Sequence, residues 1–467
     1  MKSRIENLWY WLRSSFWFVP SLMVCGAVVL AAGCLHLDER YPIQTGIGEW
    51  WAFQGGLDGA RAILSTIASS MITVAGVVFS ITIVVLSLAS SQFGPRLIRN
   101  FMNDRSSQVV LGTFISAYVY CLLVLRSFGA EPEEAFARFF SINVSFLLAL
   151  AGIGVLIFFI HRISSSIQAN NVVARVCGQL DEAILRLYPE EMGEGDGDVE
   201  DGPPVPDPSE WKEALVVEAR SSGYVQRIDV EGLMELAGAN DLVVSLSARP
   251  GDFVTKGGEL AKVDGDGSTA EEVKKAFSGS FILGPERTTE QDVEYAVSQL
   301  VEIAVRALSP GVNDPFTAIT CIDWIGVALS TIAGRKFPAS TRLDDEGRLR
   351  VIARVFTFGG LADASLNQIR QNAAAIPAVS IHMLDMLTSI GGGLRRSSDR
   401  GDLLRHCRMI HDGCRRNCSE GYDIECLDAA FHRALSVLDS TASKTPSGGA
   451  SKTAEIPPIL QPKAGGP

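Results

Sequence analysis

The chain has 467 residues, with 41 Lys plus Arg, 53 Asp plus Glu and a net charge of −12. This composition excludes a disordered chain, a collagen and a small disulfide scaffold, and the acidic balance argues against nucleic-acid binding. Residues 1–168 carry 11 basic and 9 acidic residues, whereas the remainder carries 30 and 44. The average therefore hides an apolar, nearly neutral part attached to an acidic part, which indicates a membrane protein with a soluble domain.

Four uncharged segments are long enough to cross a bilayer, which takes about 20 apolar residues. They predict a four-helix transmembrane domain over residues 1–168, with spans at about 16–37, 62–93, 109–125 and 139–160. No Asp, Glu, Lys or Arg lies within these spans, which argues against a proton-coupled carrier. Ala31–Cys34 resembles a lipoprotein cleavage site, but the long aromatic segment before it favours a retained first span.

The connections between the spans differ in charge. Basic residues prevail before the first span, after the second and after the fourth, whereas acidic residues prevail in the other two connections. Because basic residues prefer the cytoplasmic side, both termini are expected to be cytoplasmic.

The second span carries most of its small and hydroxyl-bearing residues at a 3-4 spacing, which keeps them on one helix face. With Ile83 among them, these residues are Thr66, Ser69, Thr73, Gly76, Ser80, Ser87 and Ser90. Such a face suits close helix packing, because small side chains let backbones approach and hydroxyls bond across the seam. It also suits a hydroxyl-lined path formed by several copies around an axis.

The remainder predicts four further regions before the C-terminal end. Residues 169–188 have the spacing of an amphipathic connecting helix, and 189–210 form an acidic flexible linker. Short β runs at 211–288 form a small β domain. Within it, Pro250-Gly251-Asp252-Phe253-Val254 with Gly257, Leu260 and Val263 resembles half of a barrel-sandwich, biotinyl-lipoyl-like domain, without the Met-flanked lysine that carries a cofactor there. Residues 289–440 have helical periodicity, and 441–467 read as a disordered tail.

The predicted fold class is therefore a polytopic α-helical membrane protein with four transmembrane helices and a cytoplasmic α+β domain. In that domain, a small barrel-sandwich-like β segment precedes a helical region. No cofactor is expected.

Ser309, Asn313 and Asp314 lie in a Pro- and Gly-containing break between two helical patterns. Asp314 followed by Pro315 is typical of a helix start, where Asp caps the amides and Pro fills the first position. A gating or ligand-binding role for this loop is the alternative.

Cysteine and histidine residues gather near the end of the helical region. Cys407, His411, Cys414 and Cys418 share one helix face, and one straight helix cannot surround a tetrahedral zinc. Core packing is therefore the favoured interpretation, and no metal site is expected.

Three segments resemble a bacterial inner-membrane family known as DUF2254. They are Ser-Ser-Gln-Phe-Gly-Pro-Arg at 90–96, Val-Val-Leu-Gly-Thr-Phe at 109–114 and Ala-Leu-Ser-Pro-Gly-Val-Asn-Asp-Pro-Phe-Thr-Ala at 307–318. The resemblance covers roughly residues 5–440 and implies location in the bacterial inner (plasma) membrane. It implies no catalytic or ligand-binding residue.

No nucleotide-binding loop, metalloprotease helix or nucleophile elbow is present, so an enzyme is not expected. The leading hypothesis is an oligomeric channel or transport-related protein whose second span lines the path. The alternative is a non-conducting membrane scaffold or sensor that acts through its cytoplasmic domain. The expected partners are the lipid bilayer, further copies of the chain and an ion or small solute, but no nucleic acid.

Overall fold

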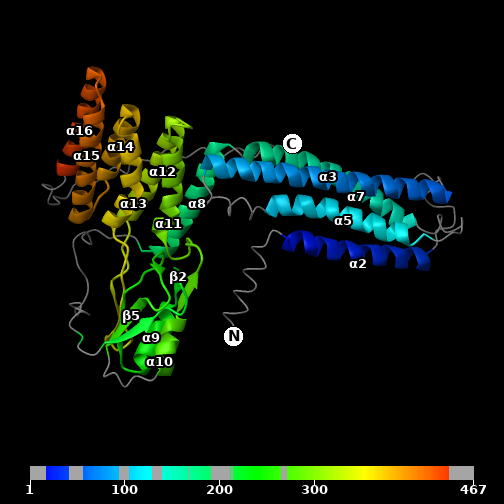
Figure 1. Cartoon of the computed structure of the whole chain (residues 1–467), viewed down its shortest axis with the longest axis horizontal. Coiled ribbons are helices and arrows are strands. Elements are labelled where there is room, and N and C mark those ends of the chain that lie inside the picture. The colour runs from blue at the N-terminus through cyan, green and yellow to red at the C-terminus, as the bar shows by residue number, and fades with distance from the viewer. Residues whose placement is uncertain are drawn as a thin grey trace, which may run out of the picture.

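The computed structural model describes residues 17–41, 56–93, 105–128, 139–166, 168–190, 211, 214–264 and 271–440. Residues 191–210 of the expected linker at 189–210 and the expected tail at 441–467 lie outside these residues. The described residues form three units, named here the bundle, the helical unit and the β unit. In Figure 1 the bundle helices run side by side, and the helices of the helical unit run across that direction.

The bundle is built around one central helix. Its members are α2 (Phe18–Arg40), α3 (Gly56–Phe93), α5 (Arg105–Arg126) and α7 (Phe139–Ser166). Helix α5 packs on the other three. In its most apolar 18-residue stretch 56% of the residues are buried, compared with 17–22% in α2, α3 and α7. The outer three helices therefore expose most of their apolar surface, as helices in lipid do.

An acidic side chain fastens the bundle at one end. Helix α2 continues past the expected end of the first span, and Asp38 in its last turn is only 2% exposed. Its carboxylate accepts hydrogen bonds from the amides of Phe140 and Ser141 and from the Ser141 hydroxyl, at 2.5–3.1 Å. Asp38 thus caps the start of α7 from another helix, which explains a buried carboxylate at this position.

The helical unit contains seven helices in the described part of the chain. They are α8 (Ala169–Leu187), α11 (Val293–Ala307), α12 (Pro315–Ala333), α13 (Phe358–Ala373), α14 (Pro377–Gly391), α15 (Ser397–Asn417) and α16 (Gly421–Ser440). One apolar core runs through all seven helices.

Five helices in the described residues are long and apolar enough to cross a membrane, rather than the four expected. The fifth is α12, which the structure packs in the helical unit against α8, α11 and α14.

The β unit consists of two sheets with two helices. Its elements are β1 (Leu215–Glu218), β2 (Gly223–Ile228), α9 (Val230–Ala239), β3 (Val243–Leu246), β4 (Phe253–Val254), β5 (Glu259–Asp264), α10 (Glu271–Gly279), β6 (Phe281–Gly284), β7 (Thr341–Leu343) and β8 (Leu349–Ile352). The strand orders are β1-β5-β3-β8-β7 and β4-β2-β6, and β8 pairs with β3 in parallel.

This topology differs from a simple barrel-sandwich segment at 211–288, and that detail is not confirmed. Two helices interrupt the run of strands, and the hairpin β7–β8 comes from a range for which only helices were expected.

Two ion pairs tie the β unit and its connection from β6 to the start of α11. Arg249 lies 2.9 Å from Glu294, and Arg287 lies 2.7 Å from Asp292, whose side chain is fully buried. Gly251, between them, has φ +94°, and a Cβ there would meet the Asp292 carboxylate. Glycine is therefore required for this turn to approach α11 so closely.

Candidate functional site on helix α3

One face of α3 holds it in the bundle. The buried residues on this face are spaced by three or four and pack on α5 and α7: Ala60, Leu64, Ala68, Met71, Ala75 and Val78. Alternating small and large side chains let α3 lie close to α5 along this seam.

The predicted hydroxyl face lies on another side of α3 and stays open among the described residues. Thr66, Ser69, Thr73, Gly76, Ser80 and Ser87 are exposed, and Ser90 is half-buried. The structure therefore brings these residues together on one open face, with Ile83 among them at 49% exposure.

The exposed face of α7 provides a contrast within the same bundle. Between 146 and 160 its exposed positions are all apolar or glycine: Phe146, Leu147, Leu150, Ala151, Ile153, Gly154, Ile157, Phe158 and Ile160. Such a surface suits lipid tails. The open face of α3 is thus chemically different from the open face of α7.

The threonine hydroxyls on this face donate hydrogen bonds to the backbone of their own helix. Thr66 Oγ1 donates to the Ala62 carbonyl and Thr73 Oγ1 to the Ser69 carbonyl, each at 2.7 Å. Because each proton is directed at the helix backbone, only the lone pairs of the oxygen remain available to groups outside the helix. The face therefore presents hydrogen-bond acceptors at these two positions.

Beyond Val78, α3 leaves the bundle and enters the helical unit. None of the ten residues 79–88 is buried, and the next buried residue, Ala89, belongs to the core of the helical unit. In Figure 1, α3 extends past the end of α5 towards α8 and α11.

Arg306 of α11 holds this end of α3. Its Nη1 atom donates to the Ser91 carbonyl at 2.7 Å and lies 3.5 Å from the Ser90 carbonyl. Glu302, one turn earlier on α11, lies 4.0 Å from the same guanidinium. The sequence places Glu302 and Arg306 beside the 309–314 loop, but nothing in their spacing indicates a contact 215 residues back along the chain.

The second predicted group, Ser309, Asn313 and Asp314, forms the connection from α11 to α12. Ser309 donates its hydroxyl to the Arg306 carbonyl at 2.6 Å, and Asn313 is exposed at φ +49°. Asp314 accepts from the Thr317 amide at 3.1 Å and from its hydroxyl at 2.6 Å, with Pro315 at the first position of α12. These contacts cap the helix and shape the turn.

The Cys and His residues of α15 have separate surroundings. Cys407 and Cys414 lie in the core of the helical unit, and burial raises the pKa of the Cys407 thiol to about 12. His411 bonds Asp428 on α16 at 2.8 Å. Within the described ranges, no group of three or more His, Cys, Asp or Glu side chains is arranged to hold a metal ion.

The exposed apolar helices and their length define a membrane protein with a substantial additional α and β region. Residues 13–389 match DUF2254, a family described as predicted membrane proteins, and the chain belongs to this family. It is also similar to curated bacterial proteins. It is 30% identical over 452 residues to the uncharacterized protein Mb1321c of Mycobacterium bovis and to Rv1290c of Mycobacterium tuberculosis. Both alignments cover 96% of this chain and 85% of the relative. No solved structure matches the chain.

Proposed function

We propose that this protein is an oligomeric channel or transport-related protein, in which the hydroxyl faces of α3 from several copies line a path. The observation that carries the proposal is the exposure of this face in the single chain, next to an α7 face that is wholly apolar. Hydroxyl groups on a lipid-exposed surface add little stability, whereas hydroxyl groups around an axis solvate water and ions.

We further propose that α2, α3, α5 and α7 cross the bacterial inner membrane and that both termini are cytoplasmic. The distribution of basic residues among the connections supports this orientation. Helix α12 is assigned to the cytoplasmic part, because its apolar window is 50% buried in the helical unit and its exposed side carries Asp323.

The chemistry of the face favours cations and water over anions. At Thr66 and Thr73 only oxygen lone pairs remain available to groups outside the helix, as their hydroxyl protons bond their own helix. No acidic residue occurs between 59 and 93, so any selectivity among cations is weak. The predicted cargo is a small monovalent cation or an uncharged solute.

The test is flux through liposomes that contain the purified full-length protein. Ser80→Leu with Ser87→Leu fills the face with apolar side chains, and we expect flux to fall at least tenfold while the oligomer persists. Ala151→Leu with Gly154→Leu is the matched control, because it adds leucine to the exposed face of α7. Absence of conductance in the unmodified protein under varied tension, voltage and pH would contradict the proposal.

The second candidate is a non-conducting scaffold or sensor in which the same faces pack as a seam between copies. The internal bonds of Thr66 and Thr73 favour it, because these hydroxyls need no water. In this case the double leucine variant loses assembly, and the unmodified protein shows no flux.

A further inference from the structure

We infer that α11 is a mechanical link through which the β unit positions the end of α3, and that Arg306 is the positioning residue at that end. The contact itself stands on the structure alone. That this contact regulates the hydroxyl face rests on the proposed function.

The first step is the attachment of α3. Arg306 binds the carbonyls of Ser90 and Ser91, which lie in the last described turn of α3. A guanidinium there also complements the negative end of the helix dipole. Ala89, 3% exposed, packs in the core that contains α8 and α11. The end of α3 is therefore fixed by both a charge-assisted bond and packing.

The second step is the attachment at the opposite end of α11. Asp292 caps the helix by accepting from the Tyr295 amide at 2.9 Å, and Arg287, in the connection from β6 to α11, bonds the same carboxylate. Arg249 of the β unit bonds Glu294 through both carboxylate oxygens, at 2.9 and 3.0 Å. A displacement of this part of the β unit must therefore move the start of α11.

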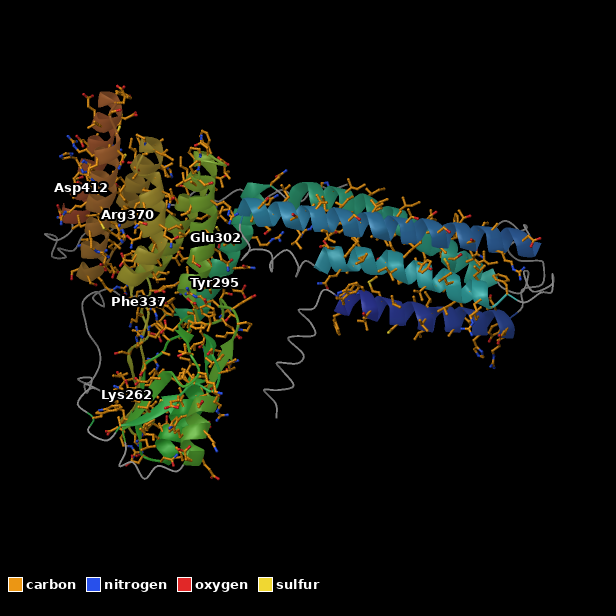
Figure 2. All side chains as sticks on the ribbon, viewed as in Figure 1. Lys262, Tyr295, Glu302, Phe337, Arg370 and Asp412 are labelled. Carbon is orange, nitrogen blue, oxygen red and sulfur yellow. The ribbon has the colours of Figure 1, made fainter. Side chains whose placement is uncertain are left out.

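The third step is the stiffness between these ends. Helix α11 has 15 residues, nine of them buried, and spans roughly 22 Å at 1.5 Å per residue. Helices packed on several sides shift as rigid elements because close-packed cores do not deform continuously. In Figure 2, Tyr295 lies towards the β unit and Glu302 towards the end of α3.

The last step is the response of α3. Residues 79–88 pack in neither core, so a shift of Ala89 to Ser91 is absorbed in this stretch. The stretch includes Ser80, Ile83 and Ser87 of the hydroxyl face. Movement of α11 thus changes the part of the face that lies outside the bundle, while the buried seam from Ala60 to Val78 stays in place.

The experiment is hydrogen exchange on the full-length protein in lipid nanodiscs, with peptides from the end of α3 as the readout. Arg306→Ala removes the bond, and we expect exchange there to rise roughly tenfold, the factor for a lost charge-assisted bond. Arg306→Lys keeps one donor and is expected to restore most of the protection. Unchanged exchange in Arg306→Ala would overturn the inference.

The distant variant separates a link from a local contact. Arg287→Ala removes the partner of Asp292 in the connection from β6 to α11, and we expect roughly threefold faster exchange at the end of α3. Arg433→Ala removes an exposed ion pair with Asp385 elsewhere in the helical unit and should leave α3 unchanged. If Arg287→Ala alters exchange only in the β unit, the link is wrong even though the Arg306 contact stands.

Flux measurements on the same variants distinguish this inference from the proposed function. If Arg306→Ala and Arg287→Ala change both exchange and flux, both proposals are supported. If they change exchange but no variant conducts, the link stands and the channel proposal fails. If the unmodified protein conducts but the end of α3 exchanges equally in all variants, the link fails.

Discussion

Helices α3 and α12 are both apolar and long enough to cross a membrane, yet the structure uses them differently. The most apolar window of α3 has a mean hydropathy of 2.5 and is 17% buried, whereas that of α12 has 1.6 and is 50% buried. Helix α12 is covered by α8, α11 and α14, and α3 is covered mainly along one seam. Neighbouring helices, rather than length and composition, thus distinguish the core of a domain from a surface left to lipid.

The largest expected effect tests this difference directly. Ile322 in α12 is fully buried, so Ile322→Ala leaves a cavity and should lower the free energy of unfolding by about 3–4 kcal/mol. Ile157 in α7 is 65% exposed, so Ile157→Ala should cost less than about 1 kcal/mol. Thermal unfolding of both variants in nanodiscs provides the measurement. Equal losses would break the distinction between buried core and lipid-facing surface.

A titratable group in the helical unit provides a second test. His406 is fully buried, and its Nε2 atom lies 3.1 Å from Asp363 Oδ1. Burial, together with the nearby positive charge of Arg405, lowers the pKa of His406 to about 4, although Asp363 acts in the opposite direction. The unfolded chain, with a His pKa of about 6.5, binds a proton that the folded chain excludes.

The contribution of His406 to the free energy of unfolding is therefore fully present above pH 6.5. It falls by about 3 kcal/mol as the pH decreases towards 4. Thermal unfolding between pH 7.5 and 4 should show this loss, and His406→Leu should flatten that part of the profile. His432→Leu is the control, because His432 is exposed. An unchanged profile in His406→Leu would assign the acid sensitivity to other groups.

The smallest expected effect concerns the α11–α12 connection. Asp314→Ala removes the cap of α12 and should cost about 1 kcal/mol, whereas Asp314→Asn keeps an acceptor and should cost less. Thermal unfolding together with liposome flux tests both roles of this loop. Flux changed by Asp314→Asn without loss of stability would favour gating over capping.

The elements could be predicted where a local pattern determines them. Long uncharged segments predict the bundle helices, and Asp314 with Pro315 predicts the start of α12. The sequence also groups the hydroxyl residues of α3 on one face, because helical spacing alone decides that.

Contacts between distant segments could not be predicted in this way. Asp38 follows the expected end of the first span at 37 but caps α7, and Arg306 precedes the 309–314 loop but binds α3. Each hydrogen bond joins segments more than 100 residues apart. No local spacing of residues in the sequence indicates either contact. One of the two strands that pair with β3 is β8 at 349–352, which follows two long helices in the chain.

That return of the chain has a consequence for biosynthesis. Strand β3 lies between β5 and β8, so one of its edges stays open until residue 352 has been made. Open strand edges template pairing with other chains. A fragment ending near 288 is therefore expected to aggregate, and the nascent β unit completes its sheet only after α11 and α12 have emerged from the ribosome. The five-stranded sheet is therefore completed only after α11, which contacts α3, has been synthesised.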